Sequence, residues 1–282
     1  GNWVFDFGQN FSGIIRLKVK GHSGHKMTMK PGELLEKDST VNQRASGGPY
    51  LWNYTLSGKG VEEWQPQFTY YGFRYVEVSN IEKLELVELT GMHTTNSAPE
   101  AGSFSCSLPM FNKIYELIDW SIRSNLASIL TDCPHREKLG WLEVAHLMQH
   151  AMQYRYQLDG LYSKVMGDIK DSQTQEGIVP SIAPEYVRFA DGFENSPEWG
   201  SAFIIIPWYV YRWYGDKSLL SAYYPYMKRY LEYLSTRADN YIVAYGLGDW
   251  FDLGPRHPGY SQLTSNGVTS TGMYYYNASI MS

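Results

Sequence analysis

The stretch GSFSCSLPMFNKIYELIDWSIRSN, residues 102–125, decides the fold because the spacing of its hydrophobic residues changes along its length. After residue 107, apolar side chains recur every three or four positions, which is the spacing along one face of an α-helix. The residues on this face are Phe111, Ile114, Tyr115, Ile118, Ile122 and Leu126. Ser107 suits the N-cap and Pro109 suits the first turn. We therefore predict a helix over 109–126 and a domain boundary at 104/105.

Upstream of this helix, residues 1–104 have the pattern of a β-sandwich domain. Short runs of alternating or β-branched residues are separated by Gly, Asn, Ser and Pro, which is typical of strands joined by turns. The predicted strands cover 3–7, 14–19, 26–29, 51–56, 68–71, 74–78 and 84–89.

Downstream, residues 105–282 have the pattern of an α/α toroid, of which about half is present. Tight connections such as Asp159-Gly160 and Gly215-Asp216 alternate with long loops, and in a toroid the long loops collect on one face. The predicted helices cover 109–126, 142–158, 161–173, 200–214 and 218–236, with another starting near 269. The long loops cover 127–141, 174–199 and 237–268.

The composition excludes several classes of protein. A formal net charge of −5 without a run of Lys or Arg argues against nucleic-acid binding, because phosphate binding needs clustered positive charge. No apolar run approaches the ~18 residues of a membrane span, so membrane insertion is not expected. Cys106 and Cys133 are too few for a disulfide framework or a cysteine-rich metal site, and His135 and His146 lack an HExxH spacing. We expect no metal and no organic cofactor.

Aromatic residues are the unusual part of the composition. They make up 16% of the chain, with 24 Tyr and 9 Trp, and such rings fill cores but also stack on sugar rings. Most of them are expected in the core. The remainder indicates a carbohydrate-binding surface.

The densest cluster of reactive side chains is TDCPHREKLGWLE, residues 131–143, in a loop that enters a helix. It holds the carboxylates of Asp132, Glu137 and Glu143 together with Arg136 and Trp141. Hydrolysis of a glycosidic bond needs one carboxylic acid to protonate the leaving oxygen and one carboxylate to activate water or attack the sugar. Spacing alone leaves two interpretations open, a catalytic loop with Glu137 as the acid and a solvated, capped loop.

The run TDCPHREKLGW resembles the catalytic-loop motif of glycoside hydrolase family 78, the α-L-rhamnosidases. The resemblance extends over nearly the whole chain, through VFDFGQNFSGIIRLKVKG, FTYYGFRYVEV, SPEWGSA and LGDWFDLG. It implies a β-sandwich followed by an (α/α)6 barrel, with residues 1–104 in the first domain and 105–282 in the N-terminal half of the second.

The resemblance also implies roles for individual residues. Glu137 matches the general acid of an inverting hydrolysis, Asp132 and Arg136 match residues that hold the rhamnose, and Trp141 matches the aromatic side chain that lines the sugar pocket. Further substrate-binding residues carried over from similar segments are Glu143, Trp199, Asp249 and Trp250.

Two departures from the family pattern bear on function. Many members continue GW-x-G-D, whereas this chain reads Gly140-Trp141-Leu142-Glu143-Val144, so Val144 stands where a sugar-binding aspartate is expected. Glu143 lies one position earlier, and one helical step turns a side chain by about 100°. The family's general base lies in later barrel helices, and both ends of the sequence look like cuts, so the base is expected outside this chain.

The favoured interpretation is an enzyme that removes terminal α-L-rhamnose from oligosaccharides or glycosides with inversion. The alternatives are a polysaccharide lyase acting on rhamnosyl-glucuronate linkages and a non-catalytic carbohydrate-binding protein, which Val144 keeps open. A polysaccharide substrate would favour a periplasmic or secreted location. The sequence leaves the oligomeric state open.

Overall fold

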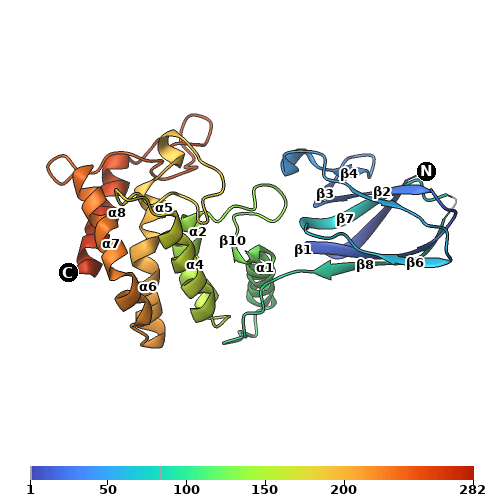
Figure 1. Ribbon diagram of the computed structural model, residues 1–282, viewed down its shortest axis with the longest axis horizontal. Helices are drawn as coiled ribbons and strands as arrows, with labels where there is room; N and C mark the ends of the chain where they lie inside the picture. Colours follow the sequence, from blue (N-terminus) through green and yellow to red (C-terminus); the bar gives the residue numbers. More distant parts are fainter. Residues whose placement is uncertain (1, 83) are drawn as a thin grey trace. The chain divides into compact units, whose positions relative to one another are not determined.

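The computed structural model describes residues 2–82 and 84–282, and its contacts divide them into two compact units. Unit 1 contains the residues up to Ser97 together with Phe104–Lys138. Unit 2 contains Ala98–Ser103 and Leu139–Ser282. Compactness therefore groups the first helix and the motif loop with the strands, while the domain boundary at 104/105 stays a prediction. Figure 1 labels the elements.

Unit 1 is built on an antiparallel sheet with the order β5-β2-β7-β1-β6, in which β8 also pairs with β1. The strands are β1 (Trp3–Lys20), β2 (Lys26–Gly32), β5 (Trp52–Thr55), β6 (Val61–Trp64), β7 (Tyr71–Ser79) and β8 (Glu85–His93). A separate small pair joins β3 (Leu34–Leu35) to β4 (Val41–Asn42), and a short 3₁₀ turn, η1 (Arg44–Ser46), follows it.

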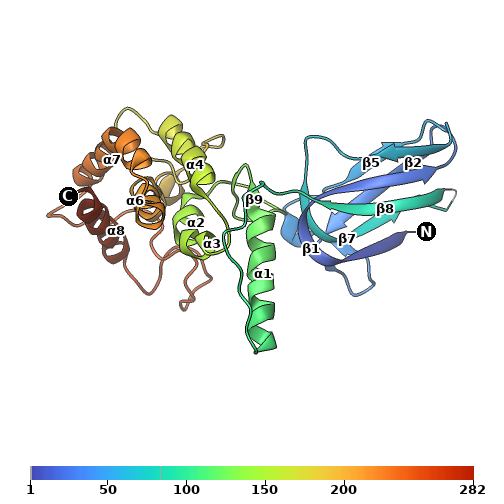
Figure 2. The same cartoon turned by 90° about the horizontal axis from the view of Figure 1, so that it is seen from below.

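The long strand β1 belongs to both halves of this sheet. Its first part pairs with β7 from Trp3 to Asp6, and its last part pairs with β6 on one side and β8 on the other. The register shifts between Asp6 and Phe11, where Gly8 has a φ of +76° that favours glycine. The two halves share one hydrophobic core, so the strand joins the layers of a sandwich (Figure 2). The core side chains are Phe11, Ile15, Leu17, Val19, Met27, Met29, Trp52, Leu56, Phe73, Val76, Val78 and Ile81.

Most of the predicted strands are confirmed, with three differences. The segments 3–7 and 14–19 form one strand, because the bulge at Gly8 bends the chain without ending its pairing. The strand predicted at 68–71 is wrong, since Phe68 is fully exposed with a φ of +57° and pairing starts only at Tyr71. The strands β3, β4 and β6 were not predicted, because the first two are two residues long and VEEW lacks an alternating apolar pattern.

The helix α1 (Pro109–Asn125) packs on β1 within unit 1, where the Ser12 N–H donates to Ser124 Oγ at 3.3 Å. Pro109 occupies the first turn as predicted, but Leu108 is the N-cap residue, so the prediction of Ser107 is wrong. The Asn112 side chain instead bonds the backbone N–H and C=O of Cys106. A two-stranded pair, β9 (Leu126–Ala127) and β10 (Ile129–Leu130), then leads into the motif loop.

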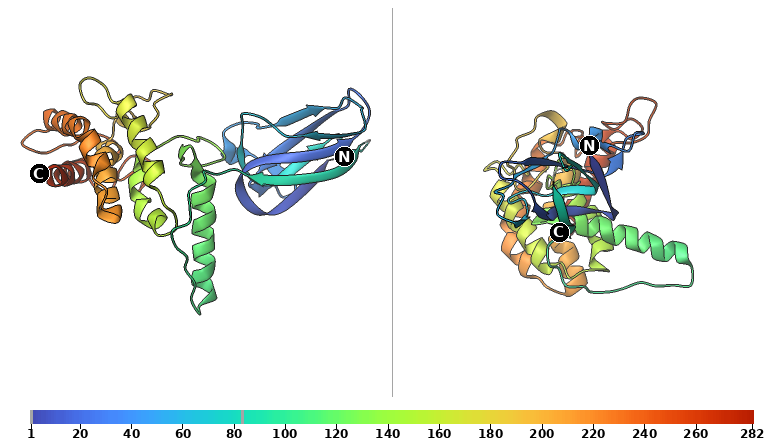
Figure 3. Two further views of the ribbon diagram at one scale, coloured as in Figure 1. Left: turned by 60° about the horizontal axis from the view of Figure 1, so that its bottom comes forward. Right: turned by 90° about the vertical axis from the view of Figure 1, so that its right-hand side faces the viewer.

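Unit 2 is helical, and α6 lies at its centre. The helices are α2 (Leu142–Leu147), α3 (Gln149–Gln153), α4 (Asp159–Ser172), α5 (Pro197–Gly200), α6 (Ala202–Tyr214), α7 (Ser218–Thr236) and α8 (Asn266–Met281), with a 3₁₀ turn η2 (Asp191–Phe193). The run from Ala202 to Pro207 is apolar and buried all round, as expected of a helix with neighbours on every side. It contacts α2, α4, α5, α7 and α8 (Figure 3).

The helix predictions are confirmed in position, with one predicted helix divided. The segment predicted over 142–158 forms α2 and α3, and that over 200–214 contains all of α6. In the described part of the chain, no helix is both long enough and apolar enough to cross a membrane.

Candidate active site

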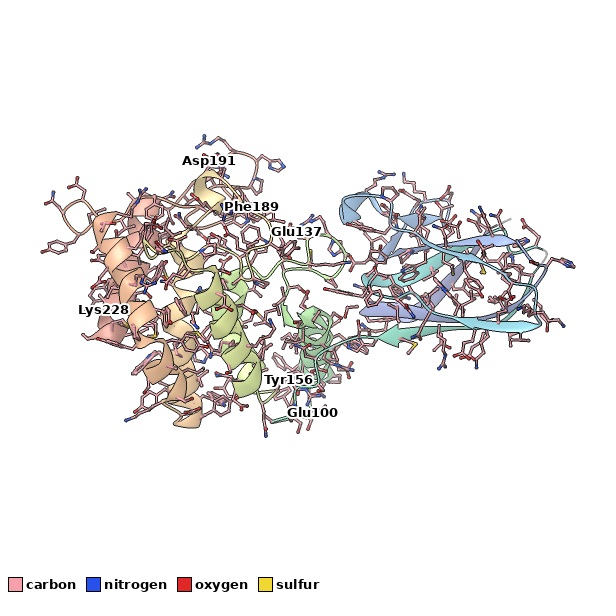
Figure 4. The ribbon with its side chains drawn as sticks, viewed as in Figure 1. Glu100, Glu137, Tyr156, Phe189, Asp191 and Lys228 are labelled. Carbon is pink, nitrogen blue, oxygen red and sulfur yellow. The ribbon has the colours of Figure 1, made fainter. Side chains whose placement is uncertain are left out.

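The motif loop, residues 131–138, is attached to the strands of unit 1. The Gly72 N–H donates to the Pro134 carbonyl oxygen at 3.0 Å, and Lys138 Nζ donates to the Tyr70 carbonyl oxygen at 2.5 Å. A Cβ atom on Gly72 would lie only 2.8 Å from Pro134 Cγ, so this close approach requires glycine. The sandwich therefore forms the surface on which the loop rests, and Figure 4 shows Glu137 on this loop.

A thiol organises the inside of the loop. Cys133 Sγ donates to Asp132 Oδ2 at 2.8 Å and accepts from the Glu137 N–H at 3.4 Å. Burial and the hydrogen bond to Asp132 raise the pKa of the Cys133 thiol, which keeps it protonated as a donor. The Asp, Cys and Glu of the motif are thus held in one hydrogen-bonded turn, which explains why these residue types follow one another at this spacing.

The two cations beside Glu137 behave differently. Arg136 Nη2 lies 3.1 Å from Glu137 Oε1, in an ion pair at the surface. Lys138 instead directs its ammonium group toward the rings of Tyr70 and Tyr71. The side chain of Glu137 is 35% exposed, so its carboxyl group is accessible to a ligand.

Asp132 lines a cavity of about 300 Å³ within unit 1, together with residues of α1 and the sandwich. Asn10 Nδ2 donates to Glu33 Oε1 at 2.9 Å, and Glu33 Oε2 lies 3.6 Å from His135 Nδ1. The cavity therefore offers carboxylate, amide and imidazole groups beside the ring of Trp120, which also lines it.

Unit 2 contains a second group of candidate residues, an aromatic cluster of Trp141, Phe189, Phe193, Trp250 and Tyr260. Trp141 stacks on Phe189, with ring centroids 5.1 Å apart and planes 27° from parallel. Phe193 contacts Trp250 edge to face at 4.9 Å, and it lies 6.3 Å from Trp141. Tyr260 completes the cluster at 5.8 Å from Phe193. Figure 4 labels Phe189 and Asp191 on the loop that supplies two of these rings.

Three carboxyl groups of unit 2 influence one another electrostatically, those of Glu143, Glu198 and Asp249. Burial raises the pKa of Glu143 to about 7, and the negative charges of Glu198 and Asp249 add to the effect. Glu198 is held by two hydroxyl donors, Ser196 Oγ at 2.7 Å and Ser270 Oγ at 2.9 Å. Glu143 can therefore hold or release a proton near neutrality.

The substrate-binding and catalytic residues predicted from the sequence fall into one group in each unit, apart from Trp199, which is buried. Asp132, Arg136 and Glu137 lie together in unit 1, and Trp141, Glu143, Asp249 and Trp250 lie together in unit 2. Trp199 is only 3% exposed in α5, so it offers almost no surface to a sugar. Val144 is half-buried on α2.

Sequence reasoning missed Phe189, Phe193 and Tyr260. These residues lie in or beside long loops without periodicity, and the only available signal was the richness of those loops in aromatic and acidic residues. Over the residues that the structure describes, no group of three His, Cys, Asp or Glu side chains could hold a metal ion.

A β-sandwich and a domain of paired helices, with carboxylates and aromatic rings on the long loops, are typical of carbohydrate-active proteins. Residues 1–95 match the bacterial alpha-L-rhamnosidase concanavalin-like domain, and residues 99–282 match the bacterial alpha-L-rhamnosidase 6 hairpin glycosidase domain. The chain belongs to the bacterial α-L-rhamnosidase family. The predicted resemblance to family 78 and the predicted order of domains are confirmed.

Relatives named alpha-L-rhamnosidase are similar over essentially all of this chain. An alpha-L-rhamnosidase of Streptomyces avermitilis is 34% identical over 99% of the chain and 27% of its own length, and one of Formosa agariphila is 31% identical over 98% and 31%. The structure of an alpha-L-rhamnosidase from Dictyoglumus thermophilum superposes with a TM-score of 0.88 at 35% identity, covering 100% of this chain and 32% of that one. That of the Streptomyces avermitilis enzyme complexed with L-rhamnose gives 0.90 at 31% identity, covering 100% and 27%. The chain thus spans about a third of the length of these relatives.

Proposed function

We propose that the protein containing this chain removes terminal α-L-rhamnose from oligosaccharides or glycosides by hydrolysis with inversion. The observation that carries the proposal is the motif loop, in which one turn holds Asp132, Cys133 and an accessible Glu137 on the sandwich. The relatives named alpha-L-rhamnosidase, and the structure of one of them complexed with L-rhamnose, support the substrate.

In this proposal Glu137 is the general acid. Its proton passes to the glycosidic oxygen as the bond to the sugar breaks, and water attacks from the opposite face of the ring. Inversion needs a second carboxylate about 6.5–9.5 Å from the acid to activate that water. We assign this general base to the part of the protein outside the chain. Arg136 Nη2 lies 3.1 Å from Glu137 Oε1, so the proposal requires the substrate to separate these two side chains before the acid acts.

Substrate contacts are proposed within each unit separately. Asp132 and Arg136 would hydrogen-bond the hydroxyl groups of rhamnose. The rings of Trp141 and Trp250 would supply apolar walls, and Glu143 and Asp249 would supply polar contacts at the edge of the aromatic cluster. Trp199 is left out of the substrate contacts because it is buried.

The products distinguish this proposal from its two alternatives. The full-length protein, incubated with a rhamnoside in an NMR tube, is expected to release rhamnose whose first-formed anomer is β. The α anomer would mean retention of configuration. An unsaturated uronate absorbing in the ultraviolet, formed from a rhamnosyl-glucuronate polymer, would identify a lyase. Binding of rhamnose without any product would identify a carbohydrate-binding protein, to which Val144 points.

A further inference from the structure

The ammonium group of Lys138 lies in a cage of tyrosine rings from the sandwich. Lys138 Nζ is 4.4 Å from the ring centroid of Tyr71, 4.6 Å from that of Tyr70 and 5.8 Å from that of Tyr50. A cation within about 6 Å of a ring face is attracted by the ring quadrupole. The Tyr70 carbonyl oxygen also accepts a hydrogen bond from the same nitrogen. We call Tyr50, Tyr70 and Tyr71 the tyrosine cage.

The tyrosine cage is held by strand pairing and by packing between rings. Tyr71 is the first residue of β7 and pairs with Gly13 of β1. Tyr50 stacks on Tyr71, with centroids 4.7 Å apart and planes 30° from parallel, and Trp52 packs against the same ring at 5.4 Å. The lysine therefore attaches the loop to rings that pack together at the start of β7.

The backbone conformation of Lys138 indicates that these contacts hold the loop in a conformation it would not adopt alone. Its φ is +57°, in the left-handed region that non-glycine residues adopt only when their surroundings hold them there. The next residue toward the N-terminus is Glu137, so the conformation at 138 helps to set the direction of the Glu137 side chain. Burial lowers the pKa of Lys138, which agrees with an enclosed ammonium group.

We propose that Lys138 is a positioning residue, and that its seat in the tyrosine cage fixes the orientation in which Glu137 presents its carboxyl group to the leaving oxygen. The proposal rests on the assignment of Glu137 as the general acid. Under this proposal the β-sandwich contributes to catalysis, because the rings around the ammonium group of Lys138 belong to that domain.

The test uses the dependence of the rate on the leaving group. A general acid matters most when the leaving group is poor and little when it is good. In the full-length protein, Lys138→Met keeps the apolar stem and removes the charge, whereas Lys138→Arg keeps a cation that can lie over the rings. Each variant is assayed on methyl α-L-rhamnoside, a poor leaving group, and on 4-nitrophenyl α-L-rhamnoside, a good one.

Lys138→Met is expected to lower kcat on the methyl glycoside by about 10-fold and on the nitrophenyl glycoside by less than about 3-fold, with KM nearly unchanged for both. Lys138→Arg should recover most of the loss. Tyr71→Leu should reproduce the loss because it removes a ring from the cage, and Tyr71→Phe should not. Lys59→Met, at an exposed lysine of the same unit, should leave both rates unchanged.

Equal losses on the two substrates, or no loss on either, would overturn the proposal. Glu137→Gln on the same pair of substrates separates it from the proposed function, since a variant without leaving-group dependence means that Glu137 is not the acid. In that case hydrogen exchange of the amides at 132–138 decides whether the cage holds the loop. Exchange about 10-fold faster in Lys138→Met than in the wild type would support the attachment of the loop by the cage, and unchanged exchange would contradict it.

Discussion

At the scale of single residues, Glu143 is a carboxyl group whose surroundings raise its pKa. Its pKa of about 7 in the folded protein stands above its ordinary value of 4.5, chiefly because it is buried. Between these pH values the folded state binds a proton that the unfolded state has lost. The free energy of unfolding therefore falls as the pH rises from about 4.5 to about 7.

Glu143→Gln should remove this pH dependence, because glutamine does not titrate. At pH 8 the variant is expected to be more stable than the wild type by up to about 3 kcal/mol, and below pH 4 the two should differ little. Urea unfolding of the full-length protein at several pH values measures the difference. Glu232→Gln on the exposed face of α7 is the matched control and should show no such trend. A Glu143→Gln variant as pH-dependent as the wild type would contradict the assignment.

Trp141 is a second residue whose role can be separated from folding. It is half-buried at the start of α2 and stacks on Phe189, so one part of the indole remains accessible. Trp141→Ala is expected to weaken binding of L-rhamnose by roughly 10-fold, or about 1.4 kcal/mol, because a stacking wall is lost. Calorimetric titration of the full-length protein gives the affinity. Trp213→Ala, at a partly exposed tryptophan at the end of α6, should bind rhamnose as the wild type does.

At the scale of elements, periodicity predicted α1 and α7 well because each of these two helices has an apolar face. The joining of two predicted strands into β1 depends on the bulge at Gly8, which periodicity cannot distinguish from a turn. The motif loop was recognisable from its amino-acid sequence. Its attachment to Gly72 and the tyrosine cage was not, because those partners lie about 60 to 90 positions away in the sequence.

The aromatic cluster shows the same limit within unit 2. Trp141 and Trp250 were identified by their motifs, whereas Phe193, the ring that joins them, lies in the turn η2 without any pattern. Trp199 was predicted from its motif as a substrate-binding residue. The structure buries its indole in α5, which the motif alone could not indicate.

The contact between Gly72 and Pro134 can be tested as an element junction. A methyl group at Gly72 would approach Pro134 Cγ to 2.8 Å and His135 Cβ to 3.2 Å, so the motif loop would have to move. Gly72→Ala is expected to cost about 1–3 kcal/mol of stability, measured by urea unfolding of the full-length protein. Gly48→Ala has open space around its Cβ and should be neutral. Equal stability of both variants would mean that the loop yields without cost.

At the scale of the whole molecule, α1 carries an uncovered apolar stripe. The exposed side chains in the structure are Met110, Phe111, Ile114, Leu117 and Ile118. They include much of the face whose spacing predicted the helix. A stripe of this kind on a protein that spans a third of its relatives favours association through exposed apolar surface.

Residues 1–282 alone are therefore expected to associate in solution and to lack rhamnosidase activity. Light scattering should report species larger than the monomer, and the pair Ile114→Ser and Ile118→Ser should reduce them. Assay on an aryl α-L-rhamnoside beside the full-length protein tests the activity. Turnover at even about a hundredth of the full-length rate would mean that a carboxylate within the chain serves as the base, and Glu143, Glu185 and Glu198 would be the ones to mutate.

The central claim is that Glu137 is the general acid of a rhamnosidase, and the rate of Glu137→Gln in the full-length protein tests it most directly. The substitution removes the proton donor while nearly preserving the volume of the side chain. The kcat on methyl α-L-rhamnoside is expected to fall by at least about 100-fold, with binding of rhamnose largely intact. Glu194→Gln, at an exposed glutamate of unit 2, is the control and should retain the wild-type rate. A Glu137→Gln variant that hydrolyses the methyl glycoside at the wild-type rate would contradict the account.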